Sequence, residues 1–160
     1  MAAVWLPELD ITRQIPAAVV QGRDPLLVLA ACCAPVEPVL RRLKCSSAEI
    51  TRGRAVDRGP ALPGSPEPVA VRRWMSAAGS AVDDLVLLAG DGPAAIELAD
   101  MVRGVRQRGE ATSRGELAVT GNDLVAAGVS VPGPELGRLL ARLLDAVLDD
   151  FIAAREREGG

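Results

Sequence analysis

Residues 113–137 read SRGELAVTGNDLVAAGVSVPGPELG and contain helix start and stop signals in close succession. Ser113-Arg114-Gly115-Glu116 and Thr120-Gly121-Asn122-Asp123 both have the spacing of a capping box, in which the first and last residues each bind the other's backbone amide. Gly128 ends the helix that follows the second box. Gly133-Pro134 begins another helix, because proline is pre-set for a first helical turn. This stretch therefore predicts short helices joined by tight turns.

Signals of the same kind recur upstream. Asp24-Pro25 provides a cap and a first-turn proline before an apolar run that Pro35 ends, and Ser46 with Glu49 forms another capping box. No window shows sustained alternation of apolar and polar residues, and the candidate strand at 117–119 is only three residues long. The sequence therefore predicts an all-α fold, an array of short helices in two small subdomains.

Proline and glycine divide the chain into four predicted segments. Residues 1–23 have little periodicity and form a connecting segment, and residues 24–58 form a first helical subdomain. Residues 59–68 contain four prolines and cannot sustain a hydrogen-bonded element, which makes them a linker. Residues 69–160 form a second helical subdomain. Within it, Ser80 is expected to cap one helix, and the last helix is expected to include Phe151 and to run to about residue 154.

The composition excludes several kinds of enzyme. The 160 residues include no histidine and no tyrosine, which excludes imidazole acid–base catalysis, histidine-activated nucleophiles and histidine metal ligands. The paired acids Asp83-Asp84 and Asp149-Asp150 diverge on a helix, so we expect them to face solvent and not to converge on a metal ion. We therefore expect no catalytic residue, no metal site and no cofactor in this chain.

Cysteine usage and hydropathy bear on the cellular compartment. The number of cysteines is odd, and all three lie in apolar or helix-like surroundings: Cys32, Cys33 and Cys45. Both features favour buried reduced thiols over a secreted disulfide framework. The beginning of the sequence does not resemble a signal peptide, and the longest apolar run, at 26–34, is too short to span a bilayer. We expect a cytoplasmic protein with no membrane partner.

Two stretches are basic although the chain has a net charge of -3. Residues 41–58 contain six basic and two acidic residues, and residues 103–114 contain four basic and one acidic residue. Guanidinium groups match phosphate oxygens in pairs, so these stretches are candidate phosphate contacts; the alternative is that they are ordinary solvated helix faces. The candidate RNA-binding residues are Arg41, Arg42, Lys44, Arg103, Arg106 and Arg108.

Aromatic residues are scarce, which limits the kind of nucleic acid that the chain can bind. They are Trp5, Trp74 and Phe151, and Trp74 is expected in the core beside Val71 and Met75. A stacking platform for single strands is therefore not expected. Any nucleic acid bound here would be a structured RNA, recognised by shape through its phosphates and sugars, and not DNA.

The turn at 128–137 has two interpretations. The amides at the start of its second helix, near Gly133, lack helical partners and favour an anion, so Gly133 is a candidate phosphate contact. Alternatively the turn is a tight corner at which Gly137 lets two helices touch. Glu135 would repel a phosphate, which favours packing for Gly137.

Residues 116–140, ELAVTGNDLVAAGVSVPGPELGRLL, strongly resemble the C-terminal region of bacterial CCA-adding tRNA nucleotidyltransferases, which belong to the poly(A) polymerase family. The shared pattern is an apolar residue, Gly, a polar residue and Asp-Leu, then Gly, and Pro-Gly-Pro before a leucine-rich helix that contains Gly. Residues 40–49, LRRLKCSSAE, are similar to the helical body of the same family. The resemblance covers about residues 24–154.

The resemblance implies a neck-like segment at 1–23, a body-like subdomain at 24–58 and a tail-like subdomain at 69–160. It implies a non-catalytic region that binds tRNA in 3′-end maturation, as a fragment or remnant without the nucleotidyltransferase head. Neither the nucleotide motif nor the paired metal-binding aspartates of that head occur here, so only the absent head would bind Mg²⁺, CTP and ATP. The expected partners are tRNA and a separate catalytic head. The alternative is a free-standing helical adaptor that no longer binds RNA.

Overall fold

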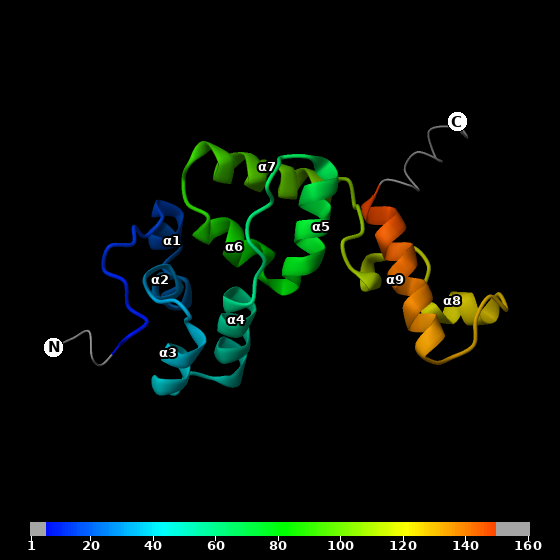
Figure 1. Ribbon diagram of the computed structural model, residues 1–160, viewed down its shortest axis with the longest axis horizontal. Helices are drawn as coiled ribbons and strands as arrows, with labels where there is room; N and C mark the ends of the chain where they lie inside the picture. Colours follow the sequence, from blue (N-terminus) through cyan, green and yellow to red (C-terminus); the bar gives the residue numbers. More distant parts are fainter. Residues whose placement is uncertain (1–5, 150–160) are drawn as a thin grey trace. The chain divides into compact units, whose positions relative to one another are not determined.

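The computed structural model describes residues 6–149 and consists of short helices (Figure 1), which confirms the predicted all-α class. Within the described residues, the β-type pairing is an isolated bridge between Leu9 and Cys33. None of the described helices combines the length and the apolar character needed to cross a membrane. The elements are α1 Ala17–Gly22, α2 Pro25–Cys32, α3 Glu37–Arg42, α4 Ser47–Asp57, α5 Pro68–Ala78, η2 Gly79–Ala81, α6 Val82–Leu88, α7 Pro93–Gln107, η3 Arg114–Glu116, α8 Gly121–Ala126 and α9 Pro134–Leu148.

The capping signals in the sequence are confirmed at three helix starts. Asp24 accepts a hydrogen bond from the Leu26 amide at 3.1 Å and begins α2. Ser46 and Glu49 exchange the two capping-box bonds at the start of α4, at 2.8 and 3.3 Å. Thr120 and Asp123 do the same at the start of α8. These local signals therefore determine where three helices begin.

Two helix boundaries differ from the prediction. Ser80 does not cap a helix: it lies inside the turn η2, and α6 begins after Ala81 with no side-chain cap. The segment 1–23, expected as a connection only, contains the helix α1. This helix forms because Val19 is almost fully buried against neighbouring helices, a tertiary contact that local periodicity does not reveal. Phe151 and the expected end of the last helix near residue 154 lie outside the described residues.

Contacts divide the chain into two compact units that do not follow the sequence order. The first unit comprises Met1–Pro63 and Ala77–Asp100, and the second comprises Gly64–Ser76 and Met101–Gly160. This grouping differs from the expected continuous segments 24–58 and 69–160. The physical reason is that Leu87 and Leu88 of α6 pack against the apolar core formed by the N-terminal helices.

In the first unit, α3 and α4 lie side by side (Figure 1). Leu40 of α3 is buried against Gly53 of α4, where an added Cβ would overlap the Leu40 side chain. The absence of a side chain at Gly53 therefore allows the two helices to approach closely. The core of the unit contains Val19, Leu26, Leu27, Ala30, Val36 and Leu40.

One arginine connects three helices of the first unit. Arg52 of α4 binds Asp24 at the start of α2 at 2.7 Å and both carboxylate oxygens of Asp84 in α6, at 2.7 and 2.8 Å. These carboxylates raise the pKa of Arg52, chiefly through the hydrogen bonds to Asp84. Asp84 was expected to face solvent, but it is only 8% exposed. The expectation was wrong because Arg52, thirty-two positions away in the sequence, compensates the buried charge.

The second unit has its own core and its own buried arginine. Val71, Trp74 and Val105 are buried, which confirms Trp74 as a core residue. Arg72 is 3% exposed, and its Nε donates to the Leu148 carbonyl at 3.0 Å while Nη1 donates to Glu110 at 3.2 Å. A guanidinium at this position neutralises the negative end of the α9 dipole. Asp149 is exposed as expected and binds Arg73 at 2.7 Å.

We expect Arg52→Gln to lower the free energy of unfolding by about 1–3 kcal/mol, because it leaves the buried Asp84 carboxylate without its bidentate partner. Urea unfolding followed by circular dichroism at 222 nm measures this change. The matched control is Arg58→Gln, since Arg58 is exposed and has no ion pair within residues 6–149. Equal stability of the two variants would show that Arg52 does not hold the three helices together.

Candidate nucleic-acid interface

The first group of predicted RNA-binding residues lies on the α3–α4 hairpin. Arg41 and Arg42 form the last turn of α3, and Lys44 follows in the connection to α4. All three side chains are exposed. Their positions at the carboxyl end of a helix suit cations, which stabilise the negative end of the helix dipole. The structure therefore brings these three predicted residues together on one exposed turn.

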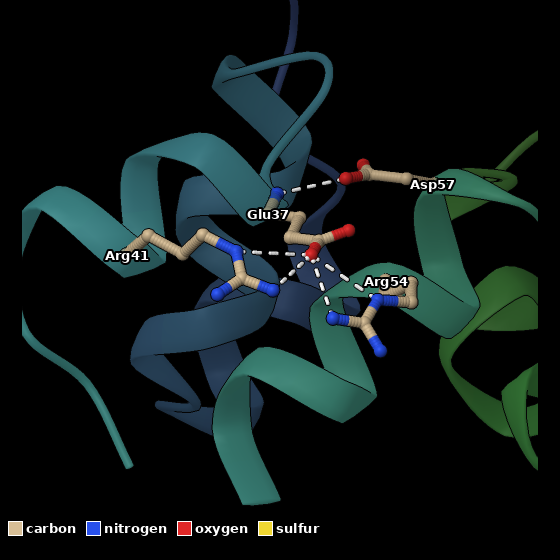
Figure 2. Close-up of polar contacts among 4 residues, drawn as sticks. All are labelled: Glu37, Arg41, Arg54 and Asp57. Carbon is tan, nitrogen blue, oxygen red and sulfur yellow. Dashed lines mark hydrogen bonds and ion pairs between the residues drawn. The ribbon is translucent and has the colours of Figure 1, made fainter. Parts of the chain in front are cut away.

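Arg41 shares a single acceptor with Arg54, a residue that the sequence analysis did not single out (Figure 2). One oxygen of Glu37, Oε1, accepts from Nε and Nη2 of Arg41 at 3.1 and 2.8 Å and from Nε and Nη2 of Arg54 at 3.1 and 3.0 Å. The guanidinium of Arg54, and then that of Arg41, lowers the pKa of Glu37 to about 2. Glu37 is therefore ionised at every pH at which the protein would be handled.

Asp57 fixes the beginning of the same hairpin. Its two carboxylate oxygens accept hydrogen bonds from the backbone amides of Val36 and Glu37, each at 2.7 Å. Figure 2 shows the bond from Glu37. Asp57 also contributes to the wall of a cavity of about 700 Å³ in the first unit, among mostly small apolar side chains and Arg13. Through its two hydrogen bonds to backbone amides, Asp57 caps the start of α3.

Lys44 has an unusual backbone conformation. Its φ is 55°, and the only other residue with positive φ that is not glycine is Arg23, with φ 52°, within residues 6–149. The amide of Lys44 bonds to the Arg41 carbonyl and that of Cys45 to the Leu40 carbonyl, which is the pattern of a Schellman motif. Glycine is the usual residue at this position. A lysine there accepts a conformational cost in order to place a cation at the tip of the turn.

Arg42 has a partner from the N-terminal segment. It forms a bidentate ion pair with Glu8, and this pair lowers the pKa of Glu8. Lys44 and Arg58, by contrast, have no ion pair within residues 6–149. The three predicted cations of the hairpin therefore differ in availability: Arg41 and Arg42 are paired with carboxylates and Lys44 is not.

The second group of predicted residues belongs to the second unit. Arg103 and Arg106 are exposed on α7, one turn apart, and Arg108 follows the end of the helix and pairs with Glu110. Because the two groups lie in different compact units, each is a separate candidate surface.

Arg138 and Arg142 are exposed cations that the sequence analysis did not select. They lie four residues apart on α9, so they share one face of the helix, and neither has an ion pair within the described residues. The sequence indicated their exposure, because both arginines lie among leucines in the pattern of an amphipathic helix. They were missed because the basic stretches chosen as candidates, 41–58 and 103–114, end before α9.

Gly137 in the α8–α9 corner acts differently from the expectation. Gly133 is exposed and begins α9 with a φ of 148°, which only glycine readily adopts. Gly137 does not allow helix contact, because nothing lies within 4 Å of the position that its Cβ would occupy. Gly121 has that role: its Cβ would lie 3.2 Å from Leu136 Cδ2 and 3.7 Å from Leu140 Cδ1. The packing interpretation is therefore wrong for Gly137, and Gly121 makes the helix contact instead.

The cysteines are free thiols, as expected. Cys33 is buried, and its burial, with the neighbouring Cys32, raises its pKa to about 11. A thiol with this pKa stays protonated and unreactive at neutral pH. Within the part of the chain that the structure describes, no three cysteine, aspartate or glutamate side chains gather in a way that could hold a metal ion.

Comparisons of the chain with protein-family models, with curated protein sequences and with solved structures find no match. Assignment of a function therefore depends on the residues and contacts described above.

We expect Gly121→Leu to lower the free energy of unfolding by about 1–3 kcal/mol, because its side chain would overpack against Leu136 and Leu140. Gly137→Leu is the matched control on the other helix of the corner. It should leave stability unchanged or raise it by up to about 1 kcal/mol, since leucine favours a helix more than glycine does. Thermal melting of the two variants decides the point, and a larger loss for Gly137→Leu would contradict the assignment.

Proposed function

We propose that this chain is a non-catalytic, tRNA-binding helical region of the kind found in the body and tail of CCA-adding nucleotidyltransferases. The observation that carries the proposal is that each of the two sequence blocks resembling that family forms a helical hairpin with exposed cations. Residues 40–49 lie in the α3–α4 hairpin with Arg41 and Lys44, and residues 116–140 lie in the α8–α9 hairpin with Arg138.

The chemistry of these surfaces favours phosphate over bases. Guanidinium and ammonium groups attract the RNA backbone regardless of sequence. Trp74 is buried and so unavailable for stacking on a base. Recognition would then depend on the shape and phosphate spacing of a structured RNA, as in tRNA.

In this proposal, nucleotide transfer belongs to a separate catalytic head. That head would bind Mg²⁺ and CTP or ATP, and this chain would hold the tRNA. We therefore expect the chain alone to add no nucleotide to a tRNA that lacks its 3′ end, when it is incubated with Mg²⁺, CTP and ATP and the products are separated on a denaturing gel. Extension above a control without protein would contradict the non-catalytic assignment.

A helical adaptor that binds protein instead of RNA is the second candidate function, and two observations favour it. Arg41 and Arg42 already pair with the chain's own carboxylates, which reduces their attraction for phosphate. Several large apolar side chains are exposed, including Ile11 at 87% and Val131 at 69%. A partner protein that covered them would remove this apolar surface from water.

Lys44→Gly separates RNA binding from stability. Glycine relieves the positive φ, so the free energy of unfolding should stay unchanged or rise by up to about 1 kcal/mol. The loss of one cation should weaken tRNA binding and reduce the slope of log affinity against log salt by about one. Fluorescence anisotropy with labelled tRNA at several salt concentrations measures both effects.

The matched control is Arg23→Gly, which has the same positive φ and the same loss of charge in the connection between α1 and α2. We expect this variant to bind tRNA like the unmodified chain. If the unmodified chain shows no salt-dependent affinity for tRNA, the adaptor becomes the better interpretation.

A further inference from the structure

The contact between Glu37 and its two arginines has more donors than acceptors. Four N–H groups, two from Arg41 and two from Arg54, converge on Oε1 of Glu37, while Oε2 accepts no hydrogen bond within the described residues (Figure 2). A guanidinium normally binds a carboxylate through two parallel hydrogen bonds to two different oxygens. Here two such forks share one oxygen, so each is bound less well than a fork with its own acceptors.

Neighbouring carboxylates do not supply the missing acceptors. Asp57 binds the amides of Val36 and Glu37, and Glu49 binds Ser46. Neither carboxylate accepts a hydrogen bond from Arg41 or Arg54 within the described residues. The two guanidiniums remain accessible from solvent, with the Arg41 side chain 54% exposed and the Arg54 side chain 37% exposed. In Figure 2, one nitrogen of each guanidinium points away from Glu37. The pair therefore has further N–H donors, reachable from solvent, that bind no acceptor within the described residues.

We propose that Arg41 binds one phosphate group of an RNA backbone, and that Glu37 holds Arg41 beside Arg54 until the phosphate arrives. The inference rests on the proposed function and adds Arg54 and Glu37 to it. A backbone phosphate presents two non-bridging oxygens with one negative charge, which gives the second fork acceptors of its own. Arg41, the more exposed of the two, turns to the phosphate, and Arg54 keeps Glu37.

Glu37 reduces the cost of this exchange. It holds Arg41 and Arg54 side by side before RNA binds, so less side-chain freedom is lost on binding. Its negative charge also competes with the phosphate, which limits the affinity of the site. Glu37 is therefore a positioning residue with two opposed effects on phosphate binding. Glu37→Gln separates these effects, because glutamine keeps an acceptor oxygen and removes the negative charge.

The shared site makes a specific prediction for two arginine variants. In Arg41→Gln, Arg54 is the only guanidinium bound to Glu37, so no arginine of the pair is left for the phosphate. In Arg54→Gln, Arg41 is the only guanidinium bound to Glu37 and stays there. Each single variant should therefore weaken tRNA binding about three- to tenfold and reduce the salt slope by about one. The loss of affinity in the double variant should be smaller than the sum of the two single losses, since each single variant already lacks the same phosphate contact.

Glu37→Gln should have the opposite effect. It should strengthen binding of labelled tRNA about two- to fivefold at low salt, because a competing negative charge is removed while the hydrogen-bond acceptor remains. A merely structural role for Glu37 predicts weaker or unchanged binding. The control is Arg23→Gln, which removes one exposed cation elsewhere in the first unit and should leave binding unchanged; circular dichroism at 222 nm verifies that all variants are folded.

The outcomes distinguish this inference from the proposed function. If tRNA binds with a salt-dependent affinity but Arg41→Gln and Arg54→Gln behave like Arg23→Gln, the phosphate site is wrong and the proposed function stands. Losses that add in the double variant would also overturn the shared site, since they indicate two independent charges. If the unmodified chain does not bind tRNA, both proposals fail.

Discussion

The first unit depends on the guanidinium of Arg52, which binds Asp24 at the start of α2 and Asp84 in α6. This contact holds α4 against two other helices, although the apolar surface of α4 is small and Gly53 is its buried residue. The position of α4 in turn determines α3, because Asp57 caps α3 and Arg54 binds Glu37. The candidate phosphate site therefore depends on an ion pair that lies outside it.

Charge along the sequence and charge on the surface differ in this protein. Residues 41–58 carry an excess of basic residues, yet Arg42, Arg52 and Arg54 bind acids that come from other segments. These ion pairs neutralise part of the basic charge and link the helices that carry the two partners. If the chain binds RNA as proposed, the cations that remain unpaired within the described residues, such as Lys44 and Arg138, would contribute more to the attraction of phosphate than the length of a basic run indicates.

Local chemistry explains what the sequence predicted correctly. The starts of α2, α4 and α8 follow from side chains that bind amides two or three residues away, so no tertiary information is needed. Features that depend on distant contacts were missed or misassigned. Helix α1 needs a core for Val19, Asp84 needs Arg52, and Gly121 rather than Gly137 faces the neighbouring helix. The Arg41–Glu37–Arg54 group was missed because Arg54 lies on the next helix, where sequence spacing gives no indication of a shared acceptor.

Paired and unpaired cations would act differently on RNA, because a paired cation must leave its carboxylate before it binds a phosphate. An unpaired side chain such as Lys44 gives up only water when it meets a phosphate, so it contributes attraction at any point where the backbone comes near. Arg41 must leave Glu37, and the exchange is favourable only where a phosphate lies close enough to give the fork two oxygens of its own. In the proposed function, unpaired cations would therefore provide general affinity, and the shared acceptor would make binding depend on the position of one phosphate. A protein that recognises RNA by shape needs both, because a charged surface without a positional requirement would bind every nucleic acid alike.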